Sequence, residues 1–389
     1  MQRRSIAPRP DWQSTAEAHG FDFHSPDGTV YWDEAHCYTF TLDEAERGLE
    51  APAADVEAMC LDIVARAVRD EAILDRLGIP TAFHDYVAGS WQRRERNLYG
   101  RMDFCFDGKG PAKLYEYNAD TPTSLYESAV FQWVWLEQMR ERGHLPPDSD
   151  QLNSLHERLV DAFRRLGIRG GIHLTAVGAS REDMGTVTYL QDCAIQAGLE
   201  TVRLPIEQIG IDTRGRFTDR DDRVITTLFK LYPWEWLLRE AFARHIPASG
   251  CRMIEPAWKS VLSNKGLMAL LWEAFPGHPN LLPTYFDGDP RAADLGHSYV
   301  RKPLYSREGA NIEIISAGCT ASASSGTPGP YGAEGHVLQA YHPLPGFAGR
   351  RPVCGVWLVA SEPAALGVRE GDADVTTDAA RFVPHVILG

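Results

Sequence analysis

The chain has 389 residues, a formal net charge of −14 at pH 7 and an apolar fraction of 44%, which is enough apolar material for a sizeable core. No apolar run approaches the roughly 20 residues of a membrane span, and no block of Lys and Arg offers a surface for nucleic acid. Seven cysteines lie singly without CxxC spacing, which disfavours disulfides and structural zinc. We therefore expect a cytoplasmic protein that binds neither membranes nor nucleic acid.

The first 95 residues predict a mainly helical part, because apolar side chains recur there at helical spacing. Thr41 and Glu44 form a capping-box pattern at one helix start. A strand hairpin and two amphipathic helices are expected next. The expected elements up to residue 170 are a helix over 53–77, strands over 102–106 and 113–118, and helices over 125–142 and 151–166.

The second half of the chain predicts a parallel sheet followed by further strands. A strand over 172–177, a helix over 182–197 and a strand over 200–204 form a strand–helix–strand unit, which implies parallel pairing. The remaining expected elements are a helix over 261–275 and strands over 298–302, 311–315, 353–360 and 366–369. Without a clear linker, residues 1–389 are expected to form one α/β (α+β) module with mixed sheets and interleaved subdomains.

One segment is compositionally biased. Residues 320–335 are rich in Ser, Gly and Pro, so they predict a surface loop without helix or strand. A loop of this length inside a compact protein is either a functional lid or an idle insertion.

Two neighbouring expected strands carry the densest chemistry. Side chains two apart on a strand share a face, so Glu116 lies with Asn118, and Arg101 with Asp103. If the strands pair as a hairpin, Asp103, Glu116 and Asn118 can converge. This all-oxygen set suits Mg²⁺ bound with nucleotide phosphates, and Arg101 could hold a phosphate or carboxylate. On spacing alone an ordinary charged strand face is the more common explanation, because alternating charged residues are frequent on strands.

Several cations follow in the second half. Lys265 lies near a helix start, where a lone cation opposes the helix dipole and suggests a nearby anion. Lys302 ends an expected strand. The turn after it contains Arg307, Gly309 and Asn311, and its backbone N–H groups could cradle a phosphate. Each lysine, taken alone, is more commonly an ordinary surface residue.

Arg369 lies on a strand or at its end, where it could neutralise charge that develops during phosphoryl transfer. The alternative is again a solvated arginine. No other common catalytic motif suggests a different function. The sequence has no Walker A loop, no GxGxxG after a strand, no HExxH and no GxSxG.

Four stretches together resemble the glutathionylspermidine synthase family. They are residues 114–125 (LYEYNADTPTSL), 263–265 with 270–276, 301–311 (RKPLYSREGAN) and 382–385 (FVPH). The similarity begins near residue 20 and runs to the C-terminus. It implies an ATP-grasp fold, and no amidase domain of the kind that precedes the synthetase in bifunctional members is expected. Approximate subregions are 1–95, mainly helical; 96–170, metal hairpin and helices; 171–255, substrate region; and 256–389, nucleotide-binding part.

The resemblance also implies a reaction. ATP phosphorylates a carboxylate, and an amine attacks the acyl phosphate to give an amide, ADP and phosphate. ATP and two Mg²⁺ ions are the implied cofactors, with a glutathione-like acid and a polyamine-like amine as candidate small-molecule substrates. By similarity the metal ligands are Asp103, Glu116 and Asn118; the nucleotide contacts Lys265, Lys302 and Gln339; the phosphoryl-steadying arginines Arg101 and Arg369; and the substrate-side residues Thr121, Thr123, Glu182 and Asp183.

Alternatives remain open. The chain could be a catalytically inactive ATP-grasp protein that binds a nucleotide or peptide, or a phosphotransferase acting on a non-peptide acid. Leu231 stands where members with known substrates carry a polar residue, so the substrates are expected only as classes. The acidic average would favour encounter with a cationic substrate such as a polyamine, although acidity that only aids solubility is the more common explanation. The sequence predicts no oligomeric state.

Overall fold

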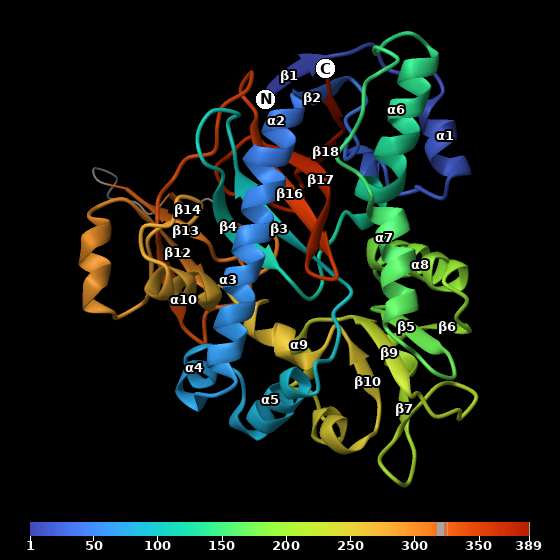
Figure 1. Cartoon of the computed structure of the whole chain (residues 1–389), viewed down its shortest axis with the longest axis vertical. Coiled ribbons are helices and arrows are strands. Elements are labelled where there is room, and N and C mark those ends of the chain that lie inside the picture. The colour runs from blue at the N-terminus through green and yellow to red at the C-terminus, as the bar shows by residue number, and fades with distance from the viewer. Residues whose placement is uncertain (317–322, 325, 389) are drawn as a thin grey trace.

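The computed structural model describes residues 1–316, 323–324 and 326–388. Within these residues the chain forms a mixed α/β fold in which several sheets are flanked by helices, as the sequence predicts (Figure 1). The described helices are all too short or too polar to span a lipid bilayer.

The central sheet is antiparallel and has the strand order β18-β17-β16-β3-β4. Its strands are β3 (Tyr99–Cys105), β4 (Lys113–Asn118), β16 (Arg351–Val359), β17 (Glu362–Gly371) and β18 (Arg381–Val383). The middle strands are buried almost throughout, because helix α3 (Ala51–Ala67) and its neighbours cover one face and further helices cover the other (Figure 1). This sheet contains the expected hairpin, so that prediction is confirmed.

A second sheet is wholly parallel and has the order β10-β9-β5-β6. Its strands are β5 (Ile172–Ala176), β6 (Thr201–Pro205), β9 (Thr227–Leu231) and β10 (Arg252–Ile254). Helix α8 (Arg181–Gln196) connects β5 to β6 and packs on both. The expected strand–helix–strand unit is therefore confirmed. A two-stranded ribbon, β7 (Gly210–Ile211) with β8 (Phe217–Thr218), lies beside it.

The third sheet carries the order β11-β15-β12-β13-β14. Its strands are β11 (Thr284–Phe286), β12 (Tyr299–Pro303), β13 (Glu313–Ile315), β14 (Ala323–Ser324) and β15 (His336–Ala340). The expected loop over 320–335 lies partly outside the described residues, at 320–322 and 325. In its described part the expectation of no strand is wrong, because β14 pairs with β13.

The two chain ends share a fourth sheet. β1 (Gln2–Ser5) pairs with β2 (His36–Phe40), and β19 (His385–Ile387) pairs with β2 in parallel. The expectation of a mainly helical first part missed β1 and β2. The partner strand β19 lies at the other end of the chain, so no local pattern announces the pairing.

The helices are shorter than their apolar patterns suggest. The expected helix over 53–77 is two helices, because Asp70 caps a new start by accepting from Ala72 N at 3.0 Å. The capping box of Thr41 and Glu44 is present. The remaining α-helices are α1 (Trp12–Ala18), α2 (Leu42–Ala45), α3 (Ala51–Ala67), α4 (Glu71–Arg76), α5 (His84–Gln92), α6 (Gln132–Glu141), α7 (Leu155–Arg165), α9 (Trp234–Leu237) and α10 (Gly266–Ala274).

Candidate active site

The hairpin of β3 and β4 brings the three expected metal ligands together. The register pairs Asp103 with Glu116 and Arg101 with Asn118, and it shifts by one residue after Asp103. Asn118 Nδ2 lies 3.2 Å from Asp103 Oδ2 and 3.2 Å from Glu116 Oε1. All three side chains line one cleft. The hairpin therefore produces the convergence that alternation along two strands predicted.

Two arginines reach the same carboxylate from different strands. Arg101 forks onto Asp103, with Nε to Oδ1 at 2.6 Å and Nη2 to Oδ2 at 2.9 Å. Arg369 Nη2 on β17 lies 3.5 Å from Asp103 Oδ2. Arg101 also stacks against Trp357, its guanidinium carbon 5.5 Å from the ring centroid. Three strands of the central sheet thus place two cations beside one proposed metal ligand.

The lysines surround the other carboxylate. Lys265 Nζ lies 3.0 Å from Glu116 Oε2, and Lys302 Nζ donates to Gln339 Oε1 at 2.7 Å. Burial opposes the charge of Glu116, but Lys265 and Lys302 together lower its pKa to about 2. Burial also lowers the pKa of Lys302 to about 8, although Glu116 works against this. At neutral pH Glu116 is therefore ionised, with Lys265 3.0 Å away and the charge of Lys302 acting on it from a greater distance.

The position of Lys265 agrees with its sequence context. It directly precedes α10, at the end of the helix where a cation is unfavourable. Its ammonium turns back to Glu116 and donates to Ser306 O at 2.8 Å. The sequence suggested an anion near the start of α10, and in the structure Glu116 is an anion at that place.

The expected phosphate-binding turn lies at the edge of the cleft. Glu308, Gly309 and Asn311 have positive φ angles of 54°, 73° and 55°. A Cβ at Gly309 would lie 2.8 Å from Val375 Cγ1, so this position needs glycine for both conformation and space. Gly309 lines the cleft, whereas Asn311 does not; its Oδ1 instead accepts from Tyr331 N at 3.3 Å.

Arg307 points to the wall that carries Thr121. Its Nη1 lies 3.3 Å from Glu235 Oε1, its Nη2 lies 3.3 Å from Thr121 O, and it also donates to Thr121 Oγ1. Thr123 lines the cleft as well, and its carbonyl accepts from Arg101 Nη1. Arg307, which belongs to the expected phosphate-binding turn, therefore contacts Thr121, which the family resemblance suggested as a substrate-side residue.

The acidic pair at the start of α8 is set back from the cleft. Glu182 and Asp183 are not among its lining residues. Burial, followed by the charges of Glu127 and Asp183, raises the pKa of Glu182 to about 8, while Arg369 opposes the rise. Burial likewise raises the pKa of Asp183 against a hydrogen bond from Ser180 and the charge of Arg307. Both acids are thus within electrostatic reach of cleft arginines.

Sequence reasoning missed several residues that line the cleft. Among them are Tyr115, Asp120, Glu235, Ser306, Asp374 and Thr376. Asp120 could have been noticed, since it follows Asn118 by two residues and continues the same alternation. Glu235 and Asp374 carry no local signal, because their place depends on how other elements pack.

The donor set fits Mg²⁺ better than a transition metal. Among the described residues no group of three or more His, Cys, Asp or Glu side chains is arranged to hold a metal. Asp103, Glu116 and Asn118 instead offer two carboxylates and an amide, a hard oxygen set that Mg²⁺ completes with water and phosphate. In the structure the Asn118 amide donates to both carboxylates, so rotation about its Cβ–Cγ bond would be needed to present the oxygen.

Comparison with solved structures identifies the fold class. A glutathione synthetase-like effector from Globodera pallida superposes with a TM-score of 0.58 at 11% sequence identity, covering 97% of this chain and 96% of that one. The fold is therefore that of glutathione synthetase-like ATP-grasp proteins. The cleft lies between the central sheet and the third sheet, which both contribute side chains to it.

The sequence identifies the family. A sequence profile described as glutathionylspermidine synthase preATP-grasp matches residues 3–388. The chain belongs to the glutathionylspermidine synthase family. It is an ATP-dependent acid–amine ligase of that kind, and the resemblance seen in the four sequence stretches is confirmed.

The relatives differ in length. A Haemophilus influenzae protein provisionally named an acid–amine ligase is 41% identical over 98% of each chain. The bifunctional glutathionylspermidine synthetase/amidase of Escherichia coli is 28% identical over 73% of this chain, and trypanothione synthetase of Crithidia fasciculata is 24% identical over 81%. The chain aligns with only 48% and 51% of the lengths of these two enzymes.

Proposed function

We propose that the protein joins a peptide-like acid to an amine through an acyl phosphate formed from ATP. The observation that carries the proposal is the meeting of Asp103, Glu116 and Asn118 with Lys265 and Arg369 in one cleft. A carboxylate does not condense with an amine in water, so its activation must be coupled to ATP. Phosphoryl transfer needs mainly positioning and charge neutralisation, which these residue types supply.

The nucleotide side of the cleft is proposed to be the lysine side. Lys265, Lys302 and Gln339 would hold the phosphates and base of ATP, with the backbone of the turn at Gly309 close to the phosphates. Asp103, Glu116 and Asn118 would hold Mg²⁺, and we propose two ions. Bound Mg²⁺ would neutralise phosphate charge and orient the γ-phosphoryl group.

The two arginines of the central sheet are proposed to act on the transferring group. Arg101 and Arg369 lie beside Asp103, so they stand next to the place where phosphate and acyl oxygens would meet. Their charge would balance the negative charge that develops as the phosphoryl group moves and as the tetrahedral intermediate forms. Thr121, Thr123 and Arg307 would orient the acid. Glu182 and Asp183 are set back from the cleft and burial raises the pKa of both, so they would contact the amine only if its bound positive charge favours their ionised forms.

The names of the relatives suggest substrate classes. Enzymes that make glutathionylspermidine or trypanothione point to a glutathione-like acid and a polyamine-like amine as the first candidates. Leu231 is buried in β9, so this position supplies no polar contact to a peptide. We therefore propose classes of acid and amine and no single pair.

The proposal is tested by an ADP-release screen across carboxylates and amines, with Mg²⁺ present and products identified by mass. We expect ADP release that needs both an acid and an amine, with an adduct lighter by one water than their sum. ATP binding without turnover across the panel would contradict the ligase and support the inactive binding protein. A stable phosphorylated acid would contradict it in favour of a phosphotransferase.

A further inference from the structure

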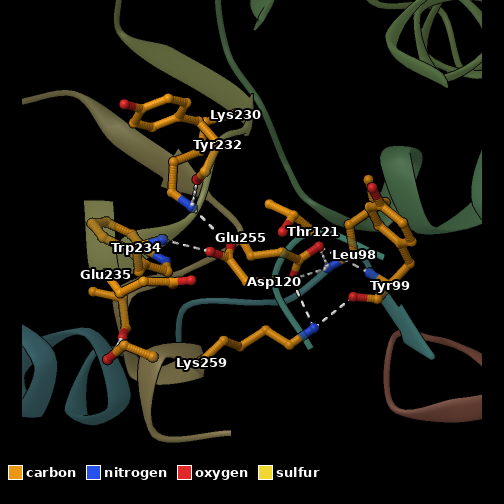
Figure 2. A network of polar contacts seen from close by, with 12 residues as sticks. Leu98, Tyr99, Asp120, Thr121, Lys230, Tyr232, Trp234, Glu235, Glu255 and Lys259 are labelled. Carbon is orange, nitrogen blue, oxygen red and sulfur yellow. Dashed lines mark hydrogen bonds and ion pairs between the residues drawn. The ribbon is translucent and has the colours of Figure 1, made fainter. Parts of the chain in front are cut away.

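A buried ion pair lies at the wall of the cleft, which Asp120 lines and Lys230 does not. Lys230 is 0% exposed and Asp120 is 1% exposed. Lys230 Nζ donates to Asp120 Oδ1 at 2.8 Å and to Tyr232 O at 2.9 Å, and Asp120 Oδ2 accepts from Trp234 N at 2.8 Å. Figure 2 shows these contacts. The two oxygens of Asp120 thus join the segment that follows β4 to Lys230 on β9 and to the first residue of α9.

This pair connects two sheets that share no strand. Asp120 follows the central sheet's β4, and Lys230 belongs to β9 of the parallel sheet. A buried ion pair stabilises a fold little compared with apolar side chains of the same size, because both charges must be desolvated. Its directional bonds do, however, define where two backbone segments lie relative to each other.

A ring of contacts leads from the pair into the cleft. Thr121 follows Asp120, and Glu235 follows Trp234. Arg307 bridges them, with Nη1 3.3 Å from Glu235 Oε1 and Nη2 3.3 Å from Thr121 O. Asp120, Thr121, Glu235 and Arg307 all line the cleft. The guanidinium of Arg307 is therefore located by two neighbours whose backbones are tied together by Asp120 and Trp234.

We propose that Asp120 and Lys230 are positioning residues that set the place of the Arg307 guanidinium on the acid-binding side of the cleft. Their effect passes through Thr121 and Glu235. The inference rests on the proposed ligase function. A displacement of about 1 Å in a group that orients a substrate can cost on the order of a hundredfold in rate. Loss of the pair is therefore expected to impair use of the acid more than use of ATP. Lys265 and Lys302 are held by Glu116 and Gln339, and Lys265 contacts only the backbone of Ser306 beside Arg307.

The test compares Asp120→Asn with the double variant Asp120→Asn/Lys230→Met. The single variant leaves an unpaired buried ammonium, whereas the double variant removes both charges and is expected to regain stability. In both, we expect kcat/KM for the acid to fall about tenfold or more while KM for ATP stays within about twofold. If the double variant regains stability and wild-type kcat/KM for the acid, the pair is only structural and the proposal is overturned.

A second buried ion pair provides the matched control. Glu255 and Lys259 are as deeply buried, with Oε2 to Nζ at 3.0 Å, and they contact the backbone at Leu98 and Tyr99 (Figure 2). Neither lines the cleft. Glu255→Gln/Lys259→Met is expected to lower the melting temperature without the selective loss for the acid. An equal selective loss in this control would overturn the proposal.

A further variant, Glu235→Gln, tests whether the ion pair acts through Glu235. Glu235→Gln keeps the size of the side chain but weakens its hold on Arg307, so it should reproduce the loss for the acid. Because both changes act on the same guanidinium, adding Glu235→Gln to the double variant should cost clearly less than the sum of the separate losses. Fully additive losses would contradict a shared path. The proposed ligase function is judged separately, by whether the unchanged chain forms an adduct.

Discussion

Gly355 on β16 lies directly opposite Asp103 on β3, and a Cβ built at Gly355 would come within 2.7 Å of Arg101 Cδ. Arg101 is 5% exposed and is fixed by its fork on Asp103 and by Trp357. Because Gly355 has no side chain, it leaves room for the Arg101 side chain, which passes over it to reach the cleft.

Gly355→Ala tests this relationship. The added methyl group must displace the middle of a buried, hydrogen-bonded side chain, so the fork of Arg101 on Asp103 is lost or shifted. We expect kcat to fall about tenfold or more, because the guanidinium no longer meets the reacting groups. Gly371→Ala is the control in the same sheet, since a Cβ there meets nothing within 4 Å. Wild-type kcat in Gly355→Ala would show that the placement of Arg101 does not matter.

Glu116→Gln removes a charge while keeping the shape of a proposed metal ligand. The neutral amide binds Mg²⁺ poorly, and it also leaves Lys265 without its partner at 3.0 Å. We expect a fall in Mg²⁺-dependent ADP release of about a hundredfold or more, together with a higher Mg²⁺ concentration for half-maximal rate. Glu313→Gln, on β13 outside the cleft, is the control and should be unchanged. Full activity of Glu116→Gln would refute the metal assignment.

Lys302 should make ATP binding depend on pH. Burial lowers the pKa of Lys302 to about 8, so its ammonium is charged below pH 8 and is progressively lost above it. Because a bound phosphate favours the charged form, ATP affinity of the free protein should fall above pH 8, approaching tenfold per pH unit. Calorimetric titrations between pH 7 and 9 measure this. Lys302→Met should bind ATP weakly at every pH; the same pH dependence in that variant would exclude Lys302 as its source.

His385 should make the fold sensitive to mild acid. Burial lowers its pKa to about 3, whereas an unfolded histidine titrates near 6.5. The unfolded chain therefore binds the proton more readily, so the stability is fully present above about pH 6.5 and falls as pH decreases from there toward 3, by at most about 1.4 kcal/mol per pH unit from this one group.

The structural reason is that His385 Nε2 accepts from Leu152 N at 3.1 Å while its Nδ1 lies 3.0 Å from Gln132 Oε1. Urea unfolding at pH 5 and 7 measures the effect. His385→Gln, which cannot take up this proton, should show a smaller difference between the two pH values. His144→Gln, at an exposed position after α6, is the control and should leave the difference unchanged. An undiminished difference in His385→Gln would contradict the prediction.

Much of the fold was accessible from local patterns. The hairpin of β3 and β4, the unit β5–α8–β6 and the capping box at Thr41 follow from alternation, helical spacing and turn residues within about 30 positions. The sheet of β1, β2 and β19 did not, because its strands come from opposite chain ends and β1 is polar. Helix ends were also misjudged, since Asp70 starts α4 within what looks like one apolar pattern.

The sequence by itself determined the family and the chemical types at the site. The family comparison confirms the family. One long motif carries Glu116 and Asn118, and Asp103 lies on the preceding expected strand, at a spacing that a hairpin brings together. The tertiary structure alone decided which cations reach these carboxylates. Lys265, Lys302 and Arg369 lie more than a hundred residues further along the chain, and only sheet packing brings them near.

The tertiary structure also decided how the two cleft arginines, Arg101 and Arg307, are held in place. Gly355 leaves room for Arg101, and the Asp120–Lys230 pair locates Arg307, because strands and turns distant in sequence pack side by side. Local sequence sets backbone shape and the chemistry of each side chain, but distances between remote groups follow from the packing of the whole core.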